Sequence, residues 1–151
     1  MQIIKDKQLV DNTWNFVDDD SELSGKGDIT VSLWRWKSQH PLLLGHSGKL
    51  GIRLTPTDHP EELVGHLNGV ELIELNFPGF GDGRPFSQAR LLRGRLGYQG
   101  EIRAVGHYLP DQVFFLVRVG VNAFQLENQD YLPLALSCMD DFTVRYQASS
   151  K

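Results

Sequence analysis

The stretch Asp82-Gly83-Arg84, followed by Ser87 and Arg90, contains the residue types of an anion-binding site. Asp82-Gly83 is typical of a tight turn, and the helix expected after it presents unpaired backbone N–H groups and the positive end of its dipole. Ser87 adds a hydroxyl donor, and the two arginines add planar guanidinium groups that suit oxyanions. This spacing predicts a binding site for a small phosphate or sulfur anion.

A structural interpretation of the same stretch is also open. In it, Asp82 caps the helix and pairs with Arg84 or another neighbour, and the glycines serve only the turn. The two interpretations differ in one respect, which is whether the carboxylate and the guanidinium of this loop are available to a ligand.

His107 is the best candidate for a general acid or base in this chain. It follows an expected strand over residues 101–105, at the edge where ligands bind in parallel α/β sheets. Histidine is the side chain that proteins most often use for proton transfer near neutral pH. A solvent-exposed histidine without a catalytic role is the simpler alternative.

The other potential metal ligands are scattered along the chain. Cys138 is the only cysteine, so the chain forms no internal disulfide, no all-cysteine metal site and no iron–sulfur cluster. The glycines of residues 79–83 do not have the spacing of a nucleotide-binding loop. We therefore expect neither a metal nor a cofactor. The remaining histidines are His40, His46, His59 and His66.

Positive charge is concentrated in residues 79–118. This segment holds six arginines and three acids, a net charge of +3, whereas the whole chain has −4 and the remainder therefore −7. One interpretation is a solvated helix face with ion pairs, and the other is a binding surface. Nucleic-acid binding is not expected, because the chain is acidic overall and has no nucleic-acid motif.

The elements that position these residues alternate between strand and helix after residue 50. This pattern predicts an α/β fold with about four parallel strands and crossover helices. The strands form either an open three-layer sheet, which we favour, or a half-barrel, and an uncovered edge would favour a homodimer. Strands are expected at 50–54, 70–76, 101–105 and 122–126, and at 143–147 in extended form. Helices are expected at 60–67, 86–96, 110–119 and 131–140.

Residues 1–49 are rich in short β-like runs and precede this core of residues 50–147 within a single domain, 1–151. They are a natural cover for the open part of the sheet. Trp34 and Trp36 are expected on one side of a strand over residues 29–34 and beyond, either as a lid over the core or as a partner contact. No apolar run is long enough to span a bilayer, and no secretory signal is recognisable, so we expect a cytoplasmic protein.

The run from Phe77 to Arg93, FPGFGDGRPFSQARLLR, resembles a specific bacterial family. The similarity continues through residues 97–106, 111–112, 118–120 and 123–124. The family is catalogued as domain of unknown function 934. Its members tend to be encoded beside an assimilatory sulfite reductase that carries sirohaem, and they are sometimes labelled oxidoreductases of sulfite reduction.

The resemblance implies an accessory protein of sulfur assimilation and cysteine biosynthesis, with the sulfite reductase as its partner. It supplies no catalytic residues, so whether the chain is an enzyme stays open. The alternative is a small enzyme or binding module for an anionic ligand at Asp82-Gly83-Arg84. A concave basic pocket at the strand ends would favour this module, whereas a filled edge with a flat basic patch would favour the accessory protein.

Overall fold

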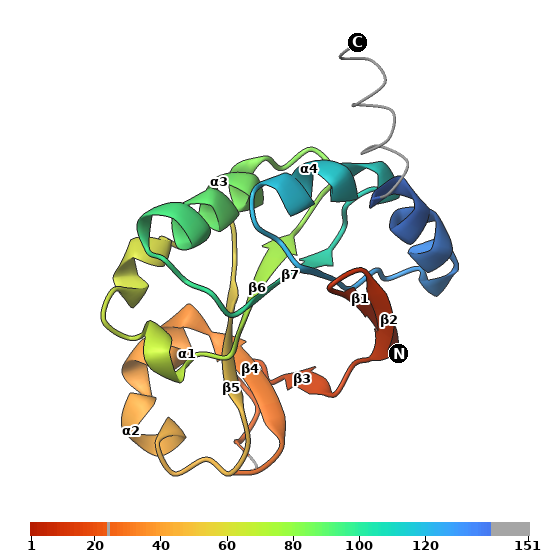
Figure 1. Ribbon diagram of the computed structural model, residues 1–151. Coiled ribbons are helices and arrows are strands. Elements are labelled where there is room, and N and C mark those ends of the chain that lie inside the picture. Colours follow the sequence, from red (N-terminus) through yellow and green to blue (C-terminus); the bar gives the residue numbers. More distant parts are fainter. Residues whose placement is uncertain (24, 140–151) are drawn as a thin grey trace.

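The computed structural model describes residues 1–23 and 25–139. Its centre is one eight-stranded sheet with the order β2-β1-β8-β7-β6-β5-β4-β3, which curls into a half-barrel (Figure 1). A hairpin of β1 (Gln2–Lys5) and β2 (Gln8–Asp11) joins antiparallel to β8. The parallel strands are β3 (Trp14–Phe16), β4 (Asp28–Ser32), β5 (Leu50–Leu54), β6 (Leu72–Phe77), β7 (Glu101–Gly106) and β8 (Ala123–Phe124).

The half-barrel was one of two arrangements that the sequence leaves open, and the open three-layer sheet that the pattern favours is not found. The chain itself explains the curl. The edge strands β2 and β3 are joined by residues 12–13 alone, and three Cα steps span at most about 11 Å. The two edges of an eight-stranded sheet lie that close only when the sheet bends round on itself.

Residues 1–49 contribute their strands to the sheet itself. The hairpin extends one edge, while β3 and β4 add two parallel strands at the other. The sequence predicts about four parallel strands, and the described residues contain six. The alternation of strand and helix already begins at β4, and β3 pairs parallel with β4 without a helix between them. Strand β4 leads directly into α1 (Leu33–Ser38).

Helical segments cover the convex side of the curl, with α3 and α4 along one stretch and α1 and α2 along another (Figure 1). A π-helical turn over Leu91–Arg95, η3, extends α3. The helix predicted over residues 86–96 ends before Gly97, which has a φ of +66°. The helical segments are α2 (His40–Leu43), η1 (Pro60–Leu63), η2 (Leu67–Gly69), α3 (Arg84–Arg90), η4 (Pro110–Gln112), α4 (Val113–Arg118), η5 (Gln129–Tyr131) and residues 132–139.

Two local predictions are wrong. Instead of a helix over residues 60–67, the chain forms η1 and η2, because Asp58 accepts a hydrogen bond from the Thr55 backbone N–H, at 2.8 Å, and does not cap a helix. Trp34 and Trp36 lie in α1 and not on a strand, because the Ser32 hydroxyl caps that helix by accepting from Arg35 N at 3.0 Å. The extended piece expected at 143–147 lies outside the described residues.

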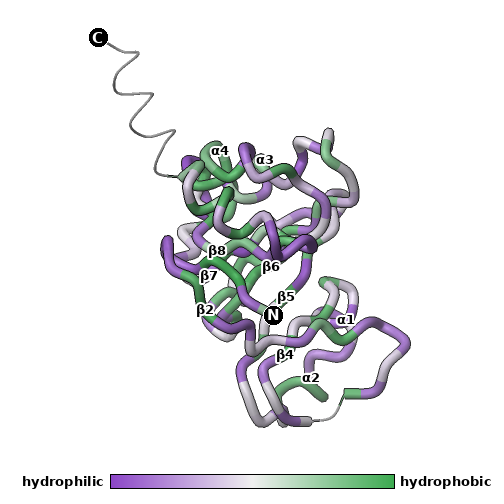
Figure 2. The backbone as a smooth tube through the Cα atoms, turned by 90° about the vertical axis from the view of Figure 1, so that its right-hand side faces the viewer, coloured by the Kyte–Doolittle hydropathy of each residue, from purple (hydrophilic) through white to green (hydrophobic). Residues whose placement is uncertain are grey.

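Side chains alternate between the two faces of the strands. On the convex face, apolar residues of β4 to β8 form the core with the helices, and Figure 2 shows the hydrophobic stretches along these central strands. On the concave face, buried positions of the same strands hold polar and charged side chains. These are Thr30, Glu74, Glu101 and Arg103.

Candidate functional site

The predicted anion loop is bonded to itself. Asp82 Oδ1 accepts from Arg84 N and Arg84 Nε, each at 3.0 Å, and Asp82 Oδ2 accepts from Arg84 Nη2 at 2.7 Å. These bonds lower the pKa of the Asp82 carboxyl and raise that of the Arg84 guanidinium. The backbone N–H of Arg84, the first free N–H of α3, and one edge of the Arg84 guanidinium therefore already have an acceptor. This is the arrangement that the structural interpretation of the loop describes.

The structure places the other predicted site residues apart from this pair. Ser87 and Arg90 are exposed on α3 and line a shallow hollow with Leu91, Gly94 and Arg95. Asp82, Gly83, Arg84 and His107 are not part of its lining. The six predicted residues are therefore not gathered in one pocket of the described chain.

His107 stands at the expected edge, directly after β7. Its backbone N–H donates to Phe77 O at 2.7 Å, and its ring lies edge-on to Phe80, with 6.1 Å between the ring centroids. Gly106, just before it, has φ of +94°, and a Cβ there would overlap the Phe77 carbonyl. The two loops after β6 and β7 are thus in direct contact.

Two glutamines tie the remaining carboxyl-end loops together. Gln88 Nε2 on α3 donates to the carbonyls of Thr55 and Asp58, at 2.8 and 3.0 Å. Gln112 Nε2 donates to Phe80 O at 3.4 Å, and its Oε1 accepts from Leu109 N at 2.8 Å. At the edge that holds ligands in most parallel α/β sheets, the loops after β6 and β7 are closely packed against each other, while a hollow of about 430 Å3 remains between α1 and the loop after β5.

Large side chains remain exposed on top of the closely packed part of this edge. Phe80 is 55% exposed and Leu109 is 44% exposed, and Gln112 links their backbones. The Arg84 side chain is 58% exposed. We call the set Phe80, Arg84, His107 and Leu109 the rim patch. It combines an aromatic ring, an aliphatic side chain, a guanidinium group and an imidazole on one exposed edge.

The basic segment is mostly engaged in structure. Arg93 donates to the carbonyls of Gly120 and Tyr98, each at 2.8 Å, and burial lowers its pKa. Arg118 lies over the Phe114 ring, 5.7 Å from its centroid. Together with the Asp82–Arg84 pair, these contacts support the interpretation of ion pairs and a solvated helix face for much of this segment.

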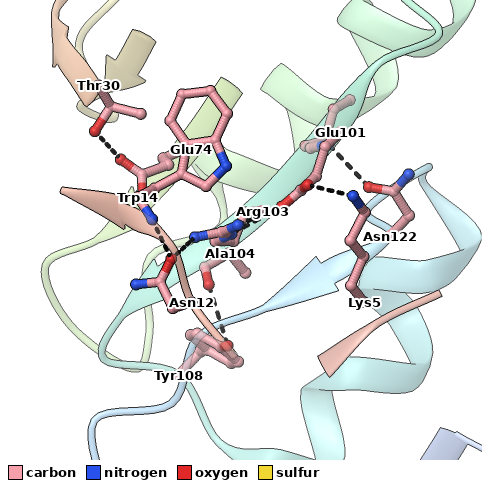
Figure 3. Close-up of polar contacts among 11 residues, drawn as sticks. Lys5, Asn12, Trp14, Thr30, Glu74, Glu101, Arg103, Ala104, Tyr108 and Asn122 are labelled. Carbon is pink, nitrogen blue, oxygen red and sulfur yellow. Dashed lines mark hydrogen bonds and ion pairs between the residues drawn. The ribbon is translucent and has the colours of Figure 1, made fainter. Parts of the chain in front are cut away.

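A second polar cluster, which the sequence did not single out as a site, lies on the concave face (Figure 3). Arg53, Glu74 and Arg103 are Cα partners in one row across β5, β6 and β7. Glu74, which is 2% exposed, accepts at Oε1 from Thr30 Oγ1 at 2.6 Å and from Arg53 Nε at 3.0 Å. Arg53 in turn lies 4.1 Å over the centre of the Phe16 ring.

Arg103 is the centre of the other half of this cluster and is only 1% exposed. Its Nε and Nη2 donate to Glu101 Oε2 at 2.9 and 2.6 Å. Its Nη1 donates to Asn12 Oδ1 at 2.9 Å, in the link between the two sheet edges. Lys5 adds a second cation 3.3 Å from Glu101.

This cluster borders a hollow of about 720 Å3 at the amino ends of the strands. We call it the amino-end hollow; its lining includes Lys5, Trp14, Tyr98, Glu101 and Asn122. Burial raises the pKa of the Tyr98 hydroxyl, which donates to Val70 O at 3.0 Å. Asn122 Oδ1 accepts from Ile102 N at 2.9 Å, so these walls are held in place by bonds to the sheet.

Sequence reasoning missed Arg53 and Glu74 although a signal exists. Each charge interrupts an otherwise apolar run of a buried strand, and the strands of parallel sheets usually read as continuous hydrophobic segments. Charged residues in the middle of such runs indicate pairing across strands. The pairing partners themselves depend on the register, which the sequence does not reveal.

No group of three or more histidine, cysteine, aspartate or glutamate side chains is placed to hold a metal ion in residues 1–23 and 25–139. Within the same residues, none of the helices has the length and apolar character needed to cross a membrane.

Comparison with known proteins gives one family. Residues 51–151 match the family described as bacterial protein of unknown function, DUF934. No curated protein matches the chain.

Proposed function

Because the chain belongs to the bacterial family DUF934, matched over two thirds of its length, we propose that it is a cytoplasmic accessory protein of assimilatory sulfite reduction. Its partner in this proposal is the sirohaem sulfite reductase beside which members of the family tend to be encoded. The protein would dock on the reductase through the rim patch and would thereby serve sulfur assimilation and cysteine biosynthesis.

The observation that carries the proposal is the closely packed part of the carboxyl-end edge, formed by the loops after β6 and β7, with exposed side chains on it. The Asp82 carboxylate already accepts three hydrogen bonds from Arg84, so this loop offers a ligand fewer free groups than its sequence suggests. Phe80 and Leu109 are exposed on the same edge. Aromatic and arginine side chains that protrude from a surface are the usual anchors of protein interfaces.

A binding measurement with the purified sulfite reductase tests the proposal. The reductase is immobilised, and this protein is titrated over it at low and at near-physiological salt. We expect saturable binding at both, since apolar anchors are not screened by salt. The proposal fails if no binding is detected at either salt concentration.

Phe80→Ala identifies the surface used. Truncation of a central aromatic anchor weakens an interface by about 2 kcal/mol, or roughly thirtyfold. Phe115→Ala is the matched control, because Phe115 on α4 is the same residue type with a similar exposure, 53%. Equal effects of the two substitutions would contradict docking through the rim patch.

A further inference from the structure

A small hollow lies between α1, α2 and η2, on the outside of the sheet. Its volume is about 260 Å3, and its lining includes Trp36, His40, Leu43, Leu50, His66 and Asn68. The fold brings the three rings together from separate segments. The ring centroids of Trp36 and His40 are 5.1 Å apart, and those of His40 and His66 are 6.2 Å apart.

Two nitrogens of this cluster have no hydrogen-bond partner among the described residues. Trp36 is only 3% exposed, and its buried Nε1–H has no acceptor. His40 Nδ1 is also buried without a partner. Buried polar groups in folded proteins nearly always have a partner, and an indole N–H can only donate. The hollow therefore lacks an acceptor at Trp36.

The chemistry of the lining selects the ligand class. No carboxylate side chain lines the hollow, so nothing there repels an anion. Both imidazoles donate from both nitrogens when protonated. A metal ion is a poor match, because two histidines fall short of the usual three or four protein ligands and an indole N–H does not bind metals. The volume is below the roughly 300–1,000 Å3 of pockets for drug-sized ligands.

We propose that this hollow binds a small oxyanion, one oxygen of which accepts a hydrogen bond from Trp36 Nε1, with His40 and His66 as further donors. The site is separate from the rim patch and from the amino-end hollow. It does not depend on the proposed docking, so the two proposals succeed or fail independently.

The indole N–H signals of a 15N-labelled sample test the site directly. The chain has three tryptophans, and Trp36→Phe assigns the signal of Trp36 by its loss. Phosphate, sulfate and sulfite are each titrated at constant ionic strength, with sodium chloride making up the difference. We expect the Trp36 signal to shift along a saturating curve with at least one of these anions, while the signals of Trp14 and Trp34 stay in place.

His66→Ala then tests the cluster without altering a buried side chain, because His66 is exposed. Loss of one hydrogen bond to a charged group weakens anion binding by about tenfold, and we expect this shift in the midpoint of the Trp36 curve. His59→Ala is the control and should leave the midpoint unchanged. The proposal is overturned if the Trp36 signal does not move, moves only linearly, or saturates at the same concentration in His66→Ala.

Discussion

The two ends of the parallel strands use their polar groups in different ways. At the carboxyl end, side chains such as Asp82 and Gln88 bond to the loops themselves, and the exposed surface includes the rim patch. At the amino end and on the concave face, the charged pairs Lys5–Glu101 and Arg53–Glu74 join neighbouring segments of the sheet, and the first of them lines a hollow of about 720 Å3. The carboxyl end is therefore closed around the loops after β6 and β7, with a hollow of about 430 Å3 beside α1, and the larger hollow lies at the amino end.

Polar residues therefore have different roles at the two ends of the sheet. The bonds at the carboxyl end hold loops of different strands in one surface, which suits contact with a large partner. The charges of the concave face replace an apolar filling inside the curl, and Arg103 reaches from β7 to Asn12 at the junction of the sheet edges. We infer that the concave cluster maintains the curl, whereas the carboxyl end provides the contact surface.

Glu101→Ala is expected to have the largest effect, because it breaks the concave cluster. It leaves the guanidinium of Arg103, 1% exposed, without its counter-charge, and breaking a buried pair in this way costs about 3–5 kcal/mol of unfolding free energy. Urea denaturation measures the loss. Glu62→Ala, in an exposed pair with Lys37, is the control and should leave the unfolding midpoint in place. Equal midpoints for the two variants would show that the concave charges are not needed for the fold.

Tyr108→Phe tests whether water is excluded from the protein interior below the rim patch. The Tyr108 hydroxyl contacts the carbonyls of Ala104 and Gln125 at 3.2 and 3.0 Å, and its loss should lower the stability at neutral pH by about 0.5–1.5 kcal/mol. Burial raises the pKa of this hydroxyl well above its usual value.

The sign of the pH effect follows from this shift. Above about pH 10 an unfolded tyrosine loses its proton while folded Tyr108 keeps it, so the unfolded state binds fewer protons and stability falls as the pH rises. Tyr108→Phe lacks this part of the loss of stability. The difference in unfolding free energy between the variant and the unmodified protein should therefore narrow above about pH 10. Tyr131→Phe, at an exposed ring, is the control. A stability difference between Tyr108→Phe and the unmodified protein that stays constant up to pH 11 would contradict the exclusion of water from the Tyr108 hydroxyl.

Arg84→Ala is expected to have the smallest effect and separates the two functions considered for the loop. If the rim patch docks on the reductase, loss of an exposed charge slows association by about two- to fivefold and reduces its salt dependence. If the loop instead binds a small anion, the same substitution abolishes that binding and leaves association with the reductase unchanged. Association rates at two salt concentrations, measured beside anion titrations, distinguish these outcomes.

Much of the carboxyl end could be predicted from the sequence. The strands at 50–54 and 101–105, the helix after Gly83 and its end at Gly97 are confirmed by β5, β7, α3 and η3. These elements carry local signals, namely apolar runs, a turn and a glycine with positive φ. The family similarity over residues 77–93 is confirmed by the match to DUF934.

The concave face and the hollow at Trp36, His40 and His66 could not be predicted in the same way. The Glu74 pair depends on the register of β5 against β6, which follows from the whole sheet. The contact between the rings of His40 and His66 depends on how α2 and η2 pack on the convex side of the sheet. The helix that contains Trp34 is capped by Ser32, which lies inside a run of alternating apolar and polar residues. This alternation by itself predicts a strand.

The central claim is that the carboxyl end, and not the amino-end hollow, contacts the sulfite reductase, and hydrogen–deuterium exchange of the complex tests it most directly. Backbone amides of residues 78–83 and 106–112 should exchange more slowly when the reductase is bound, because docking on the rim patch covers both loops. Residues 66–71 and 96–100, beside the amino-end hollow, should be unaffected. Protection of the amino-end segments with none at the rim patch would contradict the account.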